Sequence, residues 1–197
     1  MVFGVSCFVF SISSGVRGPF RFGAEANTKH ETPNTKHQTL MSPNELADQY
    51  LAGAAQLRAA VAGMTREQLV ARPVAGKWST LEVVCHISDF DPILVERMKR
   101  ILALASDVPL LLAADENLFL KALNYDARDV NEELAVIDAT RAQMARIIRG
   151  LTPEQLQLTG NHNKRGLQTL EKVIQMACNH VPHHLAFIAE KRKALGV

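Results

Sequence analysis

The chain has 197 residues, a formal net charge of +2 and 47% hydrophobic residues, enough for one domain with a well-filled core. Its basic residues are interleaved with acidic ones, as in residues 96–100, which argues against a nucleic-acid-binding surface. No apolar run reaches the length of a membrane span. We therefore expect neither nucleic acid nor membrane as a partner.

Residues 1–16 are apolar, but no basic side chain precedes Arg17, so the usual start of a signal peptide is missing. The polar stretch that follows contains a short duplication, in which residues 27–30 recur as residues 34–37. We interpret residues 1–40 as a disordered or non-native N-terminal extension. The domain is expected to span residues 41–197, with Met41 a candidate translation start.

Four segments have the apolar spacing of three and four residues that is typical of amphipathic helices. They cover about 43–63, 80–104, 129–150 and 167–195. Capping boxes are predicted at Ser42, Thr65, Ser79 and Thr152, each with Glu or Gln three residues later. The segment from about residue 109 to the third helix has poor periodicity. Asp115, Glu116 and Tyr125 in this segment could fold over the mouth of the bundle, but we favour a polar loop. Because no useful strand alternation appears, the predicted class is all-α.

The two halves of the domain resemble each other. Residues 63–69 match residues 150–156, and Thr80-Leu81-Glu82 matches Thr169-Leu170-Glu171 at nearly the same offset. Two halves related by pseudo-symmetry would place the second and fourth long helices face to face. Recurrence of a common helix-opening pattern explains the same matches equally well.

Near the C-terminus, His180 and His184 lie four residues apart and share one face of the last predicted helix. The apolar arc of that helix predicts a buried His184, a half-buried His180 and a surface His183. Pro182, between the pair, is expected to kink or loosen the turn. Two histidines on one face supply two of the three ligands of a typical three-histidine metal site.

The best third ligand is His86, on the flank of the second helix, where Glu82 and Asp89 could orient its ring. His162 is interpreted as a surface-loop residue. Solvated or hydrogen-bonded histidines are common, so spacing alone leaves metal binding and a purely structural role about equally favoured.

Three cysteines, Cys7, Cys85 and Cys178, show no pairing pattern, which favours a reducing, cytoplasmic location. Cys85 and Cys178 point to different sides of their helices from the neighbouring histidines. They are expected to be packing residues, with a catalytic thiol as the minor alternative.

Residues 76–89, together with residues 166–171 followed by His180 and His184, resemble two motifs of the DinB-like family. The resemblance covers about residues 42–197. It implies an up-down-up-down four-helix bundle, often dimeric, in which His86, His180 and His184 bind a divalent metal ion, zinc or nickel being typical. It also implies transfer or isomerisation with a low-molecular-weight thiol and an electrophilic substrate, or the metal-dependent hydrolysis for which other members are named.

The residues themselves leave the reaction open. Such a metal ion favours deprotonation of a bound water, which leads to hydrolysis, or of a bound thiol, which leads to thiol transfer. The alternative from another class is a helical interaction module whose metal is structural or absent.

Overall fold

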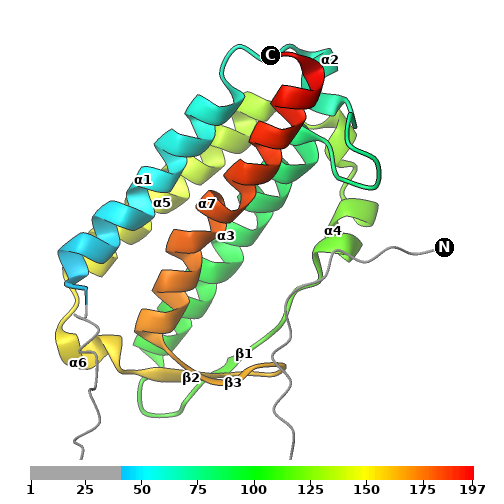
Figure 1. Ribbon diagram of the computed structural model, residues 1–197. Coiled ribbons are helices and arrows are strands. Elements are labelled where there is room, and N and C mark those ends of the chain that lie inside the picture. The colour runs from blue at the N-terminus through cyan, green and yellow to red at the C-terminus, as the bar shows by residue number, and fades with distance from the viewer. Residues whose placement is uncertain (1–40) are drawn as a thin grey trace, which may run out of the picture. The chain divides into compact units, whose positions relative to one another are not determined.

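The computed structural model describes residues 41–197, so the predictions for residues 1–40 lie outside it. Four long helices form a bundle (Figure 1). They are α1 (Pro43–Val61), α3 (Thr80–Ala103), α5 (Val130–Arg149) and α7 (Leu170–Leu195). The predicted all-α class and four-helix bundle are therefore confirmed. No helix in the described part of the chain is both long and apolar enough to cross a bilayer.

All four predicted capping boxes are present, and each precedes a helix. They pair Ser42 with Glu45, Thr65 with Gln68, Ser79 with Glu82, and Thr152 with Gln155. The second and fourth open the short helices α2 (Arg66–Val70) and α6 (Pro153–Leu156). Each half of the domain thus consists of a long helix, a short helix and a second long helix, as the internal repeat indicated.

The helix directions follow the order up-down-down-up, which differs from the expected alternation (Figure 1). Cys178 donates to a carbonyl near the start of α1, and Arg192 donates to one just past its end, so α1 and α7 are parallel. α1 packs against α5 and α7, and α3 packs against the same two helices. The reason is the long connection after α3, which returns along the bundle before α5 begins.

This connection is more regular than the loop that we expected. It contains β1 (Leu110–Leu111), α4 (Glu116–Ala122) and the 3-10 helix η1 (Tyr125–Ala127). Asp115 caps α4, because its side chain accepts hydrogen bonds from two backbone N–H groups of the first turn. The prediction of a polar loop is wrong for Tyr125, which is buried.

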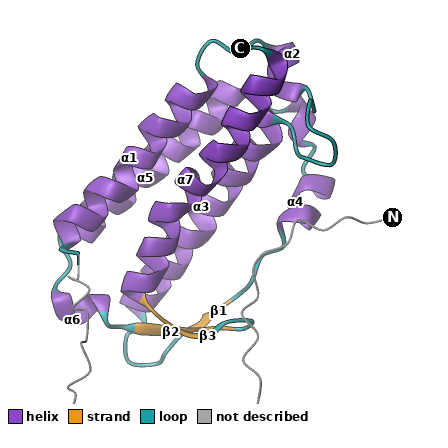
Figure 2. Ribbon diagram, viewed as in Figure 1, coloured by secondary structure: helices purple, strands orange, loops and turns teal. Residues whose placement is uncertain are grey.

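A three-stranded sheet lies at one end of the bundle (Figure 2). β1 pairs in parallel with β2 (Thr159–His162), which pairs antiparallel with β3 (Gly166–Thr169). The last helix therefore begins at Leu170 and not at residue 167. Strands of two to four residues are too short to show alternation in the sequence.

The bundle core contains one ion pair that joins all four long helices. Arg141 of α5 donates two hydrogen bonds to Asp91 of α3, at 2.6 and 2.9 Å, and both side chains are fully buried. Its guanidinium also donates to the carbonyls of Tyr50 in α1 and Ala177 in α7. This arrangement satisfies a buried charge with a carboxylate and two backbone acceptors.

Candidate metal centre

Two long helices position the three histidines predicted as ligands. The capping box at Ser79 begins α3, so His86 lies in its second turn, where it is buried. Thr169 caps α7, and His180 and His184 follow on successive turns of one face. Both are half-buried, so the expected full burial of His184 is wrong. α7 continues through Pro182, which lies on its exposed side.

The three imidazole rings converge between α3 and α7, which pack against each other as the internal repeat predicted. Nε2 of His180 lies 3.0 Å from Nε2 of His86 and 3.2 Å from Nε2 of His184. One nitrogen from each ring lies within 4.8 Å of the others. His86 and His180 are 94 residues apart in sequence, and they meet because α3 and α7 pack against each other in antiparallel directions.

All three rings favour the neutral form. Burial lowers the pKa of His86 to about 4 and that of His184 to about 3, and it lowers the pKa of His180 well below its ordinary value. The neighbouring imidazoles add to the effect at His180 and His184, because a charge on one ring disfavours a charge on the next. Neutral imidazoles are the form that binds metal ions.

The expectation that Glu82 or Asp89 orients His86 is wrong. Nδ1 of His86 is buried and has no hydrogen-bond partner in the structure, and the same holds for Nδ1 of His180 and His184. The two carboxylates have other partners, so among the described residues no carboxylate orients a ligand ring through Nδ1.

Glu82 closes the cap of α3 and accepts two hydrogen bonds from Arg72, at 2.6 and 3.1 Å. Asp89 accepts the hydroxyl of Tyr125 at 2.7 Å and two hydrogen bonds from Arg128. Glu82 therefore ties the loop before α3 to that helix, and Asp89 ties the connection after α3 to it, so neither carboxylate is hydrogen-bonded to a histidine of the cluster.

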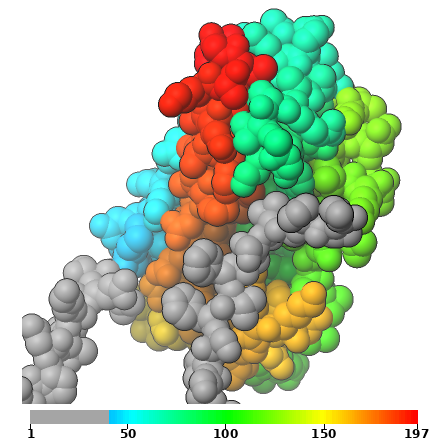
Figure 3. All heavy atoms as spheres, turned by 45° about the vertical axis from the view of Figure 1, so that its right-hand side comes forward, coloured from blue at the N-terminus to red at the C-terminus, as the bar shows by residue number. Residues whose placement is uncertain are grey.

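Aromatic side chains surround the histidines. Trp78 and Phe90 lie against the ring of His86, with centroids 5.4 and 4.4 Å away, and Phe119 of α4 packs on Phe90. Phe187 contacts His183 and His184 from the next turn of α7. The loop into α3 lies beside the C-terminal half of α7 (Figure 3), where Lys77 stacks over Phe187. Sequence analysis missed this aromatic wall, because its members come from four separate segments.

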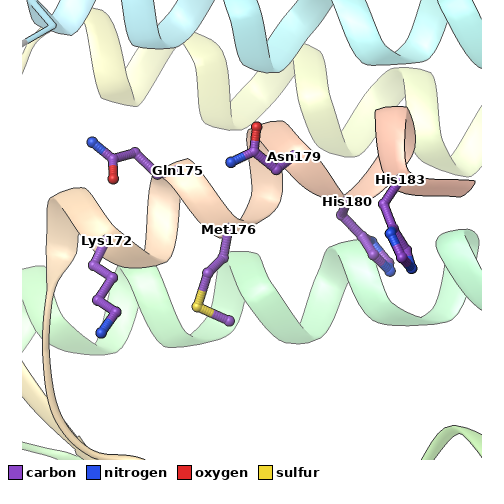
Figure 4. A pocket seen from close by; sticks show the side chains of 6 residues that line it. All are labelled: Lys172, Gln175, Met176, Asn179, His180 and His183. Atoms are coloured by element: carbon purple, nitrogen blue, oxygen red, sulfur yellow. The ribbon is translucent and has the colours of Figure 1, made fainter. Parts of the chain in front are cut away.

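A groove of about 480 Å³ runs along α7 and ends at the histidine cluster (Figure 4). Lys172, Met176, His180 and His183 point to the same side of the helix, whereas Gln175 and Asn179 lie on its other flank. The groove gives a small molecule access to the cluster from solvent.

The donor set fits a divalent metal ion. With metal–nitrogen bonds of about 2.0–2.1 Å, neighbouring ligand nitrogens are separated by roughly 3.0–3.4 Å, and both Nε2 distances from His180 lie in this range. Three converging nitrogens that face one another with their lone pairs also repel unless a proton or a cation lies between them. Three ligands leave at least one coordination position for water or substrate.

Other candidate residues lie outside the cluster. Cys85 and Cys178 are buried, and burial raises their thiol pKa to about 12 and about 11, so both are packing residues as expected. The expectation that His162 is a surface residue is wrong, because it is 4% exposed in β2. His183 is exposed, as predicted.

Comparison with known proteins agrees with this geometry. The DinB superfamily model matches residues 49–188. Two relatives carry the names "Putative metal-dependent hydrolase YfiT", from Bacillus subtilis, and "Putative metal-dependent hydrolase OB0782", from Oceanobacillus iheyensis. YfiT is 27% identical over 72% of this chain and 79% of its own length, and OB0782 is 27% identical over 70% and 79%.

The solved structure of Bacillus subtilis YfiT superposes with a TM-score of 0.73 at 24% identity, over 87% of this chain and 94% of that one. It is described as having an unusual four-helix bundle topology. The likeness extends to the fold, and the up-down-down-up order of this chain is likewise a departure from simple alternation.

Proposed function

Because this chain belongs to the DinB superfamily, we propose that it is a metal-dependent enzyme that transfers a small thiol to an electrophilic substrate. The observation that carries the proposal is the convergence of three neutral imidazole nitrogens, with no carboxylate among them, at the end of an open groove. A divalent ion such as zinc or nickel, held by His86, His180 and His184, supplies the Lewis acidity that lowers the pKa of a coordinated thiol or water.

The chain's own residues bind the electrophile and exclude water from the cluster. The aromatic wall of Trp78, Phe90, Phe119 and Phe187 presents apolar surface beside the cluster, which suits the carbon skeleton of an electrophile. It also lowers the local dielectric constant, which strengthens the preference for an anionic sulfur ligand over a neutral one. In the reaction, the sulfur forms a bond to carbon, the leaving group departs with its electron pair, and the thiol proton goes to solvent.

Hydrolysis is the second candidate, favoured by the names of the relatives. It needs a group that accepts a proton from water. Glu82 and Asp89 are held by arginines and Tyr125, and the described residues place no other carboxylate in the cluster. We prefer thiol transfer because a thiol ionises far more readily than water and so depends less on a nearby base. A non-catalytic bundle with a structural metal is the third candidate.

Metal analysis of protein purified without a metal-affinity tag or chelator tests the proposal first. We expect about one equivalent of divalent metal per chain, and loss of that metal in His86→Ala and His184→Ala. His183→Ala is the matched control, because this exposed neighbour lies outside the converging set and should leave the metal content unchanged.

Activity then separates the candidates. Thiol transfer predicts conversion of an electrophile such as a chloronitrobenzene only when thiol is added, with a calorimetric signal for thiol binding to the metal-loaded protein. Hydrolysis predicts cleavage of activated esters without thiol. Full metal occupancy with neither thiol binding nor ester cleavage would favour the third candidate, a non-catalytic bundle with a structural metal.

A further inference from the structure

We infer that the groove along α7 recognises an elongated substrate with an anionic group, which lies at the Lys172 end while the reacting end lies at the histidine cluster. This inference rests on the proposed function and adds the chemical class of the ligand, a thiol or its adduct that carries a carboxylate or phosphate. The cations that flank the groove and the histidines at its other end are the features that support it.

The first observation is a row of side chains along one stripe of α7. Lys172, Met176, His180 and His184 follow one another at intervals of four residues, so they share one face of the helix. In Figure 4, Lys172, Met176 and His180 hang from the same side and border the groove. With a rise of about 1.5 Å per residue, Lys172 lies roughly 12 Å along the helix from His180.

The second observation is another cation beside the same end. Arg165, in the turn between β2 and β3, points one guanidinium nitrogen at Sδ of Met176, 3.8 Å away. Met176 is a groove residue, so the guanidinium reaches the groove from the sheet while Lys172 reaches it from the helix. Both side chains are exposed and can contact a ligand.

The third observation is a buried arginine on which the charge of Arg165 acts. Arg97 of α3 is 6% exposed, donates to the carbonyl of Leu112 at 2.6 Å, and has a buried Nε with no hydrogen-bond partner. Burial lowers its pKa, and the charge of Arg165 lowers it further, which places the two cations within electrostatic range.

No carboxylate among residues 41–197 forms an ion pair with Lys172, Arg165 or Arg97. Of the acidic residues next to Arg97 and Lys172 in sequence, Glu96 pairs with Arg100 and Glu171 accepts a hydrogen bond from Gln175. Positive side chains that form no ion pair at one end of a groove attract an anion, and guanidinium and ammonium groups bind carboxylate and phosphate well.

The test uses protein loaded with cobalt(II), because binding of a thiolate to cobalt gives a charge-transfer absorption band that does not depend on turnover. The probes are a ten-carbon ω-mercaptocarboxylate, which spans about the required 12 Å, and the ω-mercaptoalcohol of the same length. We expect the carboxylate to bind about tenfold more tightly than the alcohol. Lys172→Ala and Arg165→Ala should each reduce this preference, and the double variant should abolish it.

Lys193→Ala is the matched control, because this exposed lysine lies on the same helix beyond the histidines. It should leave the preference unchanged, and added salt should weaken the preference in the unmodified protein. Equal affinity for the two long probes, or a preference that survives in the double variant, overturns the inference. 2-Mercaptoethanol distinguishes this failure from failure of the proposed function. If adding it to the cobalt-loaded protein gives no charge-transfer band, thiols do not bind at the metal and the proposed function itself fails.

Discussion

Gly53→Ala is expected to destabilise this protein, although the same change in most helix interiors is stabilising. Gly53 lies within α1, where replacement by alanine normally gains about 1 kcal/mol of helix propensity. Here an added Cβ would overlap Nη1 of Arg141, approach its Cζ to 3.3 Å and lie 3.4 Å from Cβ of Val181. The guanidinium must therefore move.

The size of the effect follows from the hydrogen bonds and the ion pair that Arg141 forms. Nη1 donates to the carbonyl of Tyr50 at 2.7 Å, and the same guanidinium binds both oxygens of Asp91, which has no exposed surface. Breaking a buried ion pair on one side costs about 3–5 kcal/mol. After subtraction of the propensity gain, Gly53→Ala should lower the free energy of unfolding by about 2–4 kcal/mol.

Urea unfolding of the metal-free protein, followed by circular dichroism, measures this change. Gly150→Ala is the control, because an added Cβ there meets only a backbone oxygen at 3.6 Å and should change stability little. In a second background, Asp91→Leu with Arg141→Met, Gly53→Ala should become neutral or stabilising, since the obstructing guanidinium is gone. A gain of stability from Gly53→Ala in the unmodified chain would refute the reasoning.

Three further predictions concern the site and its supports. The metal-free protein should keep its full stability above about pH 6.5 and lose about 2 kcal/mol by pH 5 for each of His86 and His184, because these rings take up protons only when the chain unfolds. Urea midpoints measured against pH should show this loss, and His86→Phe should reduce the dependence of the midpoint on pH. Tyr125→Phe should cost about 1–2 kcal/mol through loss of the hydrogen bond to Asp89, with unchanged metal content by elemental analysis; metal loss would instead mean that Asp89 acts on His86. Ser79→Ala should lower the free energy of unfolding by about 1 kcal/mol through loss of the α3 cap, a loss that Ser79→Thr should largely avoid.

Local chemistry made the helices and the histidine cluster predictable. A capping side chain and its partner three residues later lie within one turn, so Ser79 and Glu82 mark the start of α3 without knowledge of the rest of the fold. The stripe on α7 likewise places His180 and His184 together. The third member, His86, was predicted from its place on the flank of the second helix, and the resemblance and the internal repeat supported it, since nothing local joins it to α7.

Features that depend on distant partners were not predictable in this way. Asp89 looked free to orient His86, but Arg128, 39 residues later, binds it instead. His162 looked like a loop residue, because the strand that buries it has only four residues and pairs with the two-residue β1. The direction of α5 was set by the path of a long connection, and connection length alone does not say where a chain re-enters a bundle.

The return path between α3 and α5 has a consequence for how such a protein can diversify. A chain that leaves one end of the bundle and re-enters at the other must cross its flank, and here the crossing brings Phe119 against Phe90 and Tyr125 against Asp89, beside the histidines. The four long helices can keep their packing while the exposed parts of this crossing segment change in length or composition, because surface connections tolerate such changes well. The surroundings of the histidines can thus change through the exposed positions of this segment, while buried Tyr125 and its hydrogen bond to Asp89 keep the segment attached to the bundle.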